Sequence, residues 1–378
     1  MPSEPSADAA NDARYIAAAL SLARRGFGRT WPNPSVGCII VRDDGDGPVI
    51  VGRGWTQPGG RPHAETVALA EAAEAARGAT AYVTLEPCAH YGRTAPCSLA
   101  LIEAGVSRVV SAVEDPDPRV AGRGHAQLAE AGIAVDIGLM EGDAVKAGAG
   151  HITRIRRGRP YVQLKLAVSA DGKIGGRDRT PLAITGPDAG RAVHMMRAEA
   201  DAIMVGIGTV LSDDPLLTCR IPGLEARSPV RVVADSRLRT PLSSRLVRSA
   251  GETPLWIVTS EAVHDDRIAP YREAGVDIVA VPDDQSHSAM LPFMLAALAA
   301  RGITRLMVEG GARLASALVR GNLVDEAVIF TAPAMRVGHG VDALEGLDLE
   351  AVLGHDRYTL VEDAAIGPDR RRVFAREI

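Results

Sequence analysis

Three residues with metal-binding side chains and one carboxylate lie close together in the first third of the chain. His63 and Glu65 form a His-x-Glu pair, and Cys88 and Cys97 follow it, each directly after a proline. Imidazole and thiolate are ligand types that zinc prefers, and three protein ligands leave a fourth position open for water, as in catalytic zinc sites. Bound zinc lowers the pKa of water to about 7, which supplies hydroxide at neutral pH. The residues therefore predict a hydrolytic zinc site.

Glu65 is the expected proton carrier of this site. Residues two apart in a helix do not share a face, so Glu65 can point toward a substrate while His63 binds the metal ion. A carboxylate beside activated water can take its proton and pass it to departing ammonia, which is typically worth about 10²–10⁴-fold in rate. Zinc deaminases carry His-x-Glu followed by Pro-Cys-x-x-Cys, whereas here eight residues separate Cys88 from Cys97. The pattern indicates a zinc deaminase that departs from the usual cysteine spacing.

Other interpretations of the same residues stay open. Cys88 and Cys97 could be ordinary buried thiols, and His90 could complete a structural zinc site, although a substrate or loop contact is favoured for His90. A zinc deaminase of free cytosine or of adenosine in RNA is one alternative, and a non-catalytic, zinc-stabilised binding protein is another. The net charge of −5, with charges of both signs interspersed, argues against a nucleic-acid partner. Intact Glu65 and only three strong ligands argue against the binding protein.

Alternating helices and strands must position these residues. Apolar periodicity predicts helices at 12–25, 64–77, 98–105 and 124–132, and strands at 36–41, 49–55, 81–86, 107–113 and 133–138, the first two joined as a hairpin. This order is typical of a layered α/β domain, which closes near residue 150. The basic segment 151–160 turns on Gly158 and Pro160 and is expected to be a linker.

A second α/β series follows, because 378 residues are too many for one ordinary core. We expect one domain at 11–150 and another at 160–378. The second is expected to contain helices at 186–200, 288–302 and 312–320 and strands at 161–169, 201–206, 229–235, 254–260, 276–282, 305–311 and 325–333, with two late strands near the C-terminus. Two of these strands end in glycine turns, VGIGTV (205–210) and VEGGARL (308–314). Such turns let the backbone approach a phosphate at a helix N-terminus, as in a cofactor site, but by themselves they are equally compatible with tight turns between a strand and a helix.

The composition favours a soluble globular protein without a membrane partner. Apolar residues make up 46% of the chain and charged residues 24%, and no apolar run approaches the length of a membrane span. The first residues are acidic and polar, unlike a signal peptide. Four cysteines in such a chain favour metal binding or catalysis over a disulfide framework. We expect a cytoplasmic protein.

With these motifs in place, the chain resembles a known family. The matching segments are WPNPSVGCIIV (31–41), PHAE (62–65), TLEPCAHYGRTAPC (84–97), DPDPRVAGRG (115–124), QLKLAVSADGKI (163–174), MRAEADAIMVGIGTVLSDDPLLT (196–218), VVADS (232–236), VEGGARLASAL (308–318) and LVDEAVIFTAP (323–333). They are similar to those of the bifunctional riboflavin-biosynthesis deaminase–reductases, whose expanded cysteine spacing accounts for the departure between Cys88 and Cys97. The resemblance covers essentially the whole chain.

The resemblance implies a fold, two reactions and two cofactors. The first domain would have a cytidine-deaminase-like three-layer α/β fold and the second a dihydrofolate-reductase-like α/β fold. The first would hydrolytically deaminate 2,5-diamino-6-(5-phosphoribosylamino)pyrimidin-4(3H)-one, and the second would use NADPH to reduce the ribosyl group of the product to ribityl. One Zn²⁺ per chain and NADPH are the implied cofactors, and the family suggests a homo-oligomer.

The resemblance also carries roles to matching residues of the deaminase domain. His63, Cys88 and Cys97 would bind zinc, and Glu65 would be the proton donor. Asn33 lies in a Pro-Asn-Pro loop that resembles the pyrimidine-contacting loop of the family, although it could simply be a turn residue.

In the reductase domain the matches divide into cofactor and substrate positions. The NADP positions are Ala167, Thr209, Asp213, Ser236, Gly311, Ala312, Arg313, Leu314, Ala315, Ser316 and Ala317, and the substrate positions are Arg197, Leu217, Arg220 and Glu309. Arg197 and Arg220 could hold a ribose phosphate through forked, charge-assisted hydrogen bonds, and Glu309 could accept from N–H groups. Lys165, inside a strand, is expected to reach the ribose, with a snorkelling surface residue as the alternative.

One loop departs from the pattern of the family. Where the family has Ser-x-Trp-Ile-Thr, this chain has PLAIT at 181–185. In the family the serine touches substrate and the tryptophan touches cofactor, and neither Pro181 nor Ala183 can make those contacts. The alternative function is therefore a zinc deaminase of another base, with a reductase domain impaired at Pro181 and Ala183.

Overall fold

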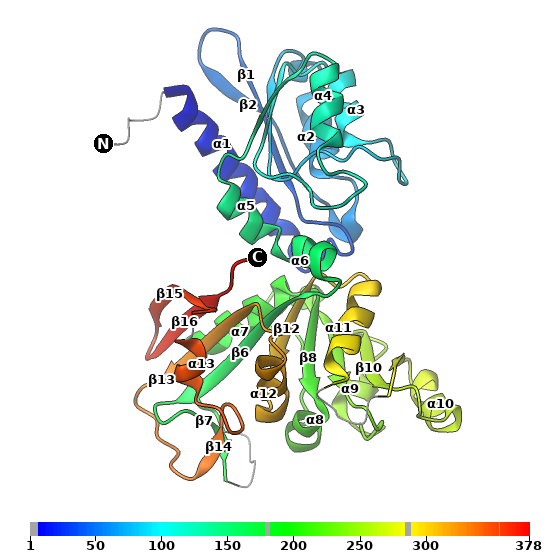
Figure 1. The fold of residues 1–378 in the computed structure, drawn as a ribbon, viewed down its shortest axis with the longest axis vertical. Coiled ribbons are helices and arrows are strands. Elements are labelled where there is room, and N and C mark those ends of the chain that lie inside the picture. The colour runs from blue at the N-terminus through cyan, green and yellow to red at the C-terminus, as the bar shows by residue number, and fades with distance from the viewer. Residues whose placement is uncertain (1–6, 178–181, 284–288, 355) are drawn as a thin grey trace. The chain divides into compact units, whose positions relative to one another are not determined.

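The computed structural model describes residues 7–177, 182–283, 289–354 and 356–378. Contacts within the chain divide it into two compact units, one ending at Arg157 and the other spanning Gly158–Glu377 (Figure 1). Each unit is built on a sheet of its own, and the two sheets differ in their number and order of strands.

The first unit contains a five-stranded sheet with the order β2-β1-β3-β4-β5. Its strands are β1 (Gly37–Asp43), β2 (Pro48–Trp55), β3 (Thr80–Val83), β4 (Arg108–Ser111) and β5 (Ala134–Ile137). β1 pairs antiparallel with both β2 and β3, whereas β3, β4 and β5 run parallel. The predicted β1–β2 hairpin is therefore confirmed.

Helices cover both faces of this sheet, as Figure 1 shows. They are α1 (Ala7–Ala23), α2 (Ala64–Ala72), α3 (Cys97–Ala104), α4 (Arg123–Glu130), α5 (Glu141–Ala147) and α6 (Ala149–Arg157). A Cβ on Gly37 would lie 1.9 Å from the Ala19 carbonyl oxygen of α1, and a Cβ on Gly54 would lie 2.0 Å from that of Ala64 in α2. Gly54 pairs with Cys38, the neighbour of Gly37, so the two glycines face opposite sides of the sheet. The predicted three-layer arrangement is confirmed.

The expectation of a linker at 151–160 is wrong. Ala149–Arg157 form helix α6, which belongs to the first unit. His151, Ile152 and Thr153 on this helix are only 7%, 1% and 1% exposed. Tertiary packing of these side chains stabilises the helix, which the arginine-rich sequence by itself does not predict.

The second unit contains a nine-stranded sheet with the order β11-β10-β9-β8-β12-β6-β13-β16-β15. The strands are β6 (Tyr161–Ser169), β8 (Ala202–Gly206), β9 (Val230–Ala234), β10 (Leu255–Ser260), β11 (Asp277–Val281), β12 (Arg305–Glu309), β13 (Glu326–Ala332), β15 (Thr359–Ile366) and β16 (Asp369–Ala375). Neighbours from β11 through β13 run parallel, and β16 and β15 add an antiparallel edge. A separate two-stranded sheet joins β7 (Lys173–Gly176) to β14 (Gly340–Asp342).

The helices of this unit are α7 (Pro187–Glu199), α8 (Ile207–Asp213), α9 (Arg245–Arg248), α10 (Asp265–Glu273), α11 (Leu291–Ala300), α12 (Ala312–Arg320) and α13 (Leu349–Leu353). The sequence predicts α12 with the same bounds, whereas it does not predict α8 and α10. The helix expected at 288–302 is observed as α11, and residue 288 lies outside the described residues.

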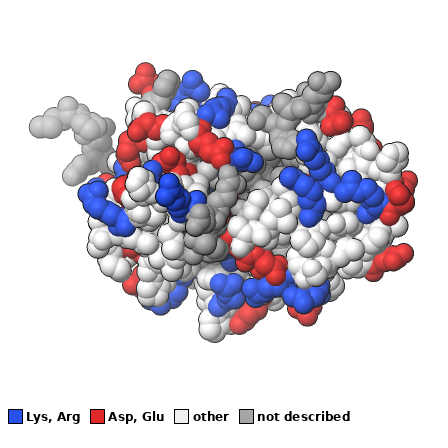
Figure 2. Space-filling view, turned by 90° about the horizontal axis from the view of Figure 1, so that it is seen from below, with Lys and Arg blue, Asp and Glu red and all other residues white. Residues whose placement is uncertain are grey.

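The surface carries charges of both signs. Figure 2 shows Lys and Arg side chains next to Asp and Glu side chains over the face that it draws. No helix in the described part of the chain is long and apolar enough to cross a membrane.

Candidate active sites

The metal-binding side chains predicted from the sequence lie together in the first unit. His63 Nδ1 is 3.3 Å from Cys97 Sγ and 3.7 Å from Cys88 Sγ. The three ligand atoms lie within 4.8 Å of one another, and His90 is not part of this group. An imidazole and two thiolates suit zinc, so these residues fit that ion, and three ligands are the number of a catalytic rather than a structural site.

Local structure explains how the ligands reach one another. His63 precedes α2 with an extended backbone (φ −70°, ψ 162°), and Glu65 lies in the first turn of that helix. Cys97 begins α3, and its N–H donates to Cys88 Sγ at 3.3 Å. The N–H and Oγ of Ser98 donate to the Cys88 carbonyl at 3.2 and 3.1 Å. These hydrogen bonds hold the two ends of the loop together. The two cysteines therefore lie side by side although eight residues separate them in the sequence.

The electrostatics of the cluster favour a metal-binding thiolate. A hydrogen bond from Cys97, aided by one from His63, lowers the pKa of Cys88 to about 4 despite its burial. The same contact raises the pKa of Cys97, so the two thiols share one proton. Thiolate is the form of cysteine that binds metal ions. Glu65 is only 4% exposed, and burial, together with the negative Cys88, raises the pKa of its carboxyl.

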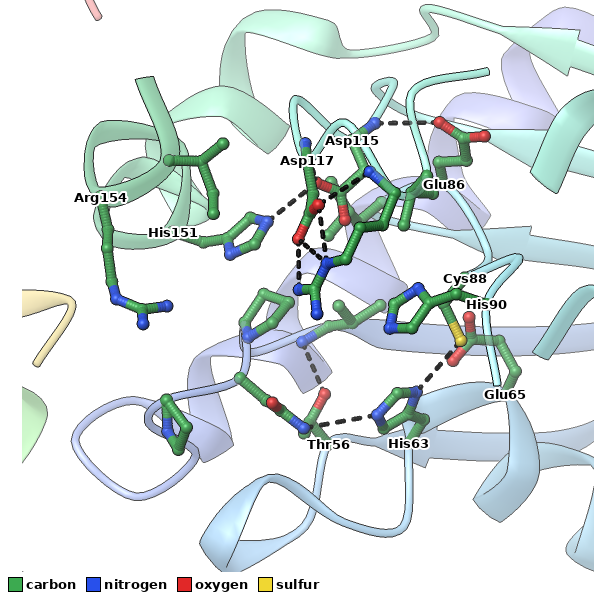
Figure 3. A pocket seen from close by; sticks show the side chains of 18 of the residues that line it. Thr56, His63, Glu65, Glu86, Cys88, His90, Asp115, Asp117, His151 and Arg154 are labelled. Atoms are coloured by element: carbon green, nitrogen blue, oxygen red, sulfur yellow. Dashed lines mark hydrogen bonds and ion pairs between the residues drawn. The ribbon is translucent and has the colours of Figure 1, made fainter. Parts of the chain in front are cut away.

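A pocket of about 280 Å³ opens beside these residues (Figure 3). Asn33 lines it and donates from Nδ2 to the Gly60 carbonyl at 2.8 Å, and the same nitrogen lies 3.4 Å from His63 Nε2. His90 lines the pocket as well. The predicted pyrimidine contact thus lies directly beside a predicted zinc ligand.

Glu86 fixes the loop that forms another wall of this pocket. Its carboxylate, only 3% exposed, accepts from the backbone N–H groups of Asp115 (3.1 Å), Gly122 (3.0 Å), Gly124 (2.8 Å) and His125 (3.3 Å). These donors replace the hydration that a buried anion loses. Glu86 therefore holds the segment 115–125 against the site.

In the second unit the predicted residues gather at one edge of the sheet. Lys165 and Ala167 lie on β6, Glu309 ends β12, Gly206 ends β8, and Ser236 follows β9. These strands are parallel neighbours, so their carboxyl ends share an edge. Open α/β sheets bind ligands in the crevice outside such an edge.

Arg197 on α7 forms a largely buried ion pair with Glu309. Its Nε and Nη2 donate to the carboxylate at 2.6 and 2.9 Å, and its Nη1 donates to the Thr218 carbonyl at 3.0 Å. Burial by itself would raise the pKa of Glu309, but Arg197 and Lys165 lower it below its ordinary value. Burial lowers the pKa of Lys165, an effect that Glu309 opposes. Contrary to the expectation from sequence, Glu309 occupies the Arg197 fork, which is therefore not open to a phosphate.

The Gly310–Gly311 turn lies against α8. Both glycines have positive φ, 73° and 69°, and a Cβ on Gly311 would lie 3.2 Å from Thr209 Oγ1. Glycine adopts this conformation without strain, which explains its presence here. Of the predicted cofactor stretch, the buried residues are Ala312, Leu314, Ala315 and Ser316, whereas Arg313 is exposed. The buried side chains pack inside the unit, so the backbone of the turn is the part that can meet a phosphate.

Three further predicted residues follow the start of α8. Leu217 is 3% exposed in the core and has φ of +58°, so only its backbone can reach a ligand. Arg220 is exposed, and its backbone N–H donates to His194 Nδ1 at 3.2 Å. Asp213 is exposed and accepts from Ser212 Oγ at 2.5 Å.

Both units match known families. Residues 160–369 match the RibD C-terminal domain, and residues 9–113 match the cytidine and deoxycytidylate deaminase zinc-binding region. The chain is 42% identical to the riboflavin biosynthesis protein RibD of Escherichia coli K12 over 371 residues, 95% of this chain and 97% of that protein. The chain belongs to the RibD family.

Other members of the RibD family match over similar lengths. RibD of Haemophilus influenzae is 42% identical over 335 residues, 86% of each chain. A structure of Acinetobacter baumannii RibD superposes with a TM-score of 0.85 at 34% identity, covering 98% of this chain and 100% of that one. A Thermotoga maritima diaminohydroxyphosphoribosylaminopyrimidine deaminase/5-amino-6-(5-phosphoribosylamino)uracil reductase gives 0.83 at 31% identity, with the same coverage.

Membership of the RibD family confirms the predicted class of enzyme. The chain is a deaminase joined to a reductase of riboflavin biosynthesis, with a cytidine-deaminase-like first domain of the zinc-binding type. Its reductase domain is of the NADPH-dependent RibD type. These matches do not favour the alternative of a deaminase of another base with an impaired reductase. In the departing loop, Pro181 lies outside the described residues, and Ala183 is exposed.

Several residues of the deaminase pocket were not predicted from the sequence. They are Asp115, Asp117, Arg119, His151 and Arg154. The motif DPDPRV after β4 contains the first three, and two closely spaced carboxylates after a strand were a usable signal. His151 and Arg154 were missed because the segment 151–160 was interpreted as a linker.

Proposed function

We propose that the chain deaminates 2,5-diamino-6-(5-phosphoribosylamino)pyrimidin-4(3H)-one and then reduces the ribosyl group of the product to ribityl with NADPH. The observation that carries this proposal is the His63–Cys88–Cys97 group beside buried Glu65, joined in one chain to a RibD-type reductase domain. The Thermotoga relative, whose name gives both activities, supports the choice of substrate.

In the deaminase domain, His63, Cys88 and Cys97 would hold one Zn²⁺, which supplies an activated water when bound. Glu65 takes a proton from the attacking water on its carboxylate and delivers it to the leaving amino group, so that ammonia departs as the hydroxyl group replaces it on the ring. Asn33 contacts the pyrimidine ring from its loop. Burial of Glu65 keeps bulk water from competing for the proton.

In the reductase domain, NADPH supplies a hydride when bound. The Gly310–Gly311 turn offers backbone N–H groups and a helix N-terminus to a cofactor phosphate, and Thr209 lies beside this turn. Glu309, oriented by Arg197, accepts from N–H groups of the substrate ring, and Lys165 reaches the ribose. The exposed Arg220 binds the substrate phosphate, because the fork of Arg197 already donates to Glu309.

A two-step assay tests this proposal. Purified protein with Zn²⁺ and NADPH is expected to convert the diaminopyrimidine phosphate to the ribitylaminouracil phosphate, releasing ammonia and NADP⁺ in equal amounts. Ammonia is measured enzymatically, NADPH by absorbance and the product by mass spectrometry. NADPH oxidation should require the deaminated intermediate. Absence of either product would contradict the corresponding half of the proposal.

Substitution of Arg220 tests the phosphate assignment. Arg220→Ala is expected to raise the KM of the reductase for the deaminated intermediate about tenfold, because a charge-assisted hydrogen bond to phosphate is lost. The effect should disappear with a substrate that lacks the phosphate. Arg272→Ala, at an exposed arginine on α10, is the matched control and should leave KM unchanged. Unchanged kinetics in Arg220→Ala would remove this residue from the site.

The cytoplasmic location, the homo-oligomeric state and the absence of a nucleic-acid partner stay predictions. Cell fractionation, light scattering of the purified protein and a filter-binding assay with RNA test them in turn.

A further inference from the structure

Helix α6 places a histidine, His151, in the deaminase pocket. This residue is neither a predicted zinc ligand nor the predicted proton carrier. His151 is 7% exposed and lines the same pocket as His63 and Glu65 (Figure 3). Its Nε2 lies 2.9 Å from Asp115 Oδ1, and each of the two side chains is 8% exposed. We propose that His151 is a positioning residue of the deaminase, which holds Asp115 so that its second carboxylate oxygen receives a donor group of the substrate.

The contacts of Asp115 leave one oxygen for a ligand. Oδ1 accepts from His151 and from the Asp117 backbone N–H at 2.9 Å, and the Asp115 N–H donates to Glu86 at 3.1 Å. In the described parts of the chain, Oδ2 accepts no hydrogen bond. An ionised carboxylate only accepts, so Oδ2 suits an N–H or O–H donor. Ring amino groups and ribose hydroxyls of a phosphoribosylaminopyrimidine are donors of this kind, and to that extent the inference rests on the proposed function.

The neighbouring aspartate is held in a different way. Asp117 accepts from Arg119 Nε at 3.0 Å and from Nη2 at 2.5 Å, a bidentate pair within its own loop. Asp115 has no such arginine partner, and its only side-chain partner among the described residues is His151. Because the carboxylate accepts, Nε2 of His151 carries the proton. The histidine therefore sets the orientation of Asp115, whereas Asp117 is fixed locally.

Two substitutions at His151 separate the hydrogen bond from the packing. His151→Leu fills the space but removes the donor, and it is expected to raise the KM of deamination about tenfold with kcat within about twofold of wild type. His151→Gln can place an amide N–H near the position of Nε2, and it should bring KM back to within about threefold of wild type. Should His151→Leu fail to fold, His151→Met serves the same comparison. Zinc content and the reductase rate of the same preparations are expected to equal those of wild type.

A double-mutant cycle tests whether His151 acts through Asp115. The KM of the Asp115→Asn, His151→Leu double variant should equal that of Asp115→Asn alone, because the histidine then has nothing left to orient. Thr153→Val is the matched control: Thr153 is 1% exposed on the same helix, and its hydroxyl has no hydrogen-bond partner among the described residues. This control should leave KM unchanged.

The outcomes distinguish this inference from the proposed function. Equal KM in wild type and His151→Leu, equal losses in His151→Leu and His151→Gln, or additive effects in the cycle would each overturn the positioning role. A wild-type protein that does not deaminate the diaminopyrimidine phosphate overturns the proposed function, and the substrate contact at Asp115 with it.

Discussion

Replacing Glu65 with Gln is expected to abolish ammonia release while the zinc content stays at the wild-type level. Glutamine keeps the shape of the side chain in a site where Glu65 is 4% exposed, but it cannot take a proton from water or deliver one to the leaving amine. Positioned proton transfer is worth about 10²–10⁴-fold in rate, so the loss should be at least of that order. Metal analysis and an ammonia assay on one preparation measure both quantities.

The chain supplies two controls for this experiment. The reductase domain of Glu65→Gln should reduce the deaminated intermediate at the wild-type rate, since it belongs to a separate unit. Glu71→Gln changes an exposed glutamate of the same helix, which pairs with Arg53 at 2.7 Å, and should leave deamination intact. A wild-type rate of ammonia release from Glu65→Gln would show that another group carries the proton.

The residues of the deaminase centre could be predicted because they lie in short sequence motifs. His63 and Glu65 are two residues apart, and the helix start between them sets their directions without help from the rest of the chain. Cys88 and Cys97 each follow a proline and are ligand types with few other uses in such a chain. The closure of the loop by Ser98 was not visible in the sequence, because a serine that donates to a distant carbonyl has no pattern of its own.

The features that escaped prediction depend on contacts between distant segments. His151 meets Asp115 across 36 residues, and Arg197 meets Glu309 across 112. The apolar periodicity of a sequence does not predict contacts between such distant side chains. The basic composition of 151–160 instead indicated a linker. The guanidinium of Arg197 was considered a phosphate ligand because the sequence shows this hydrogen-bond donor. It does not show that folding places the carboxylate of Glu309 beside it. The layered α/β arrangement, by contrast, follows from the alternation of helix and strand.

Substitution of Glu309 should have the largest effect in the second unit. Arg197 and Lys165 lie beside this carboxylate, and the Arg197 and Glu309 side chains are 11% and 12% exposed. Glu309→Gln removes the anion beside two largely buried basic side chains, and breaking a buried pair in this way costs about 3–5 kcal/mol. We expect the free energy of unfolding of the second unit to fall by about 3 kcal/mol and the kcat/KM of the reductase to fall at least about 100-fold. Hydrogen exchange of β12 and NADPH oxidation measure the two effects.

The pH dependence of stability gives an independent check on the same pair. The pKa of Glu309 in the folded protein is below its ordinary value of 4.5, so the ionised carboxylate stabilises the fold above that pH. This contribution is lost as the pH falls through the folded pKa, and the difference in stability between wild type and Glu309→Gln should therefore shrink in acid. Glu350→Gln breaks an exposed pair with Arg372, in which the glutamate is 65% exposed, and should cost less than about 1 kcal/mol. Equal effects of the two substitutions at neutral pH would mean that solvent reaches the Arg197–Glu309 pair and that its burial does not anchor the reductase site.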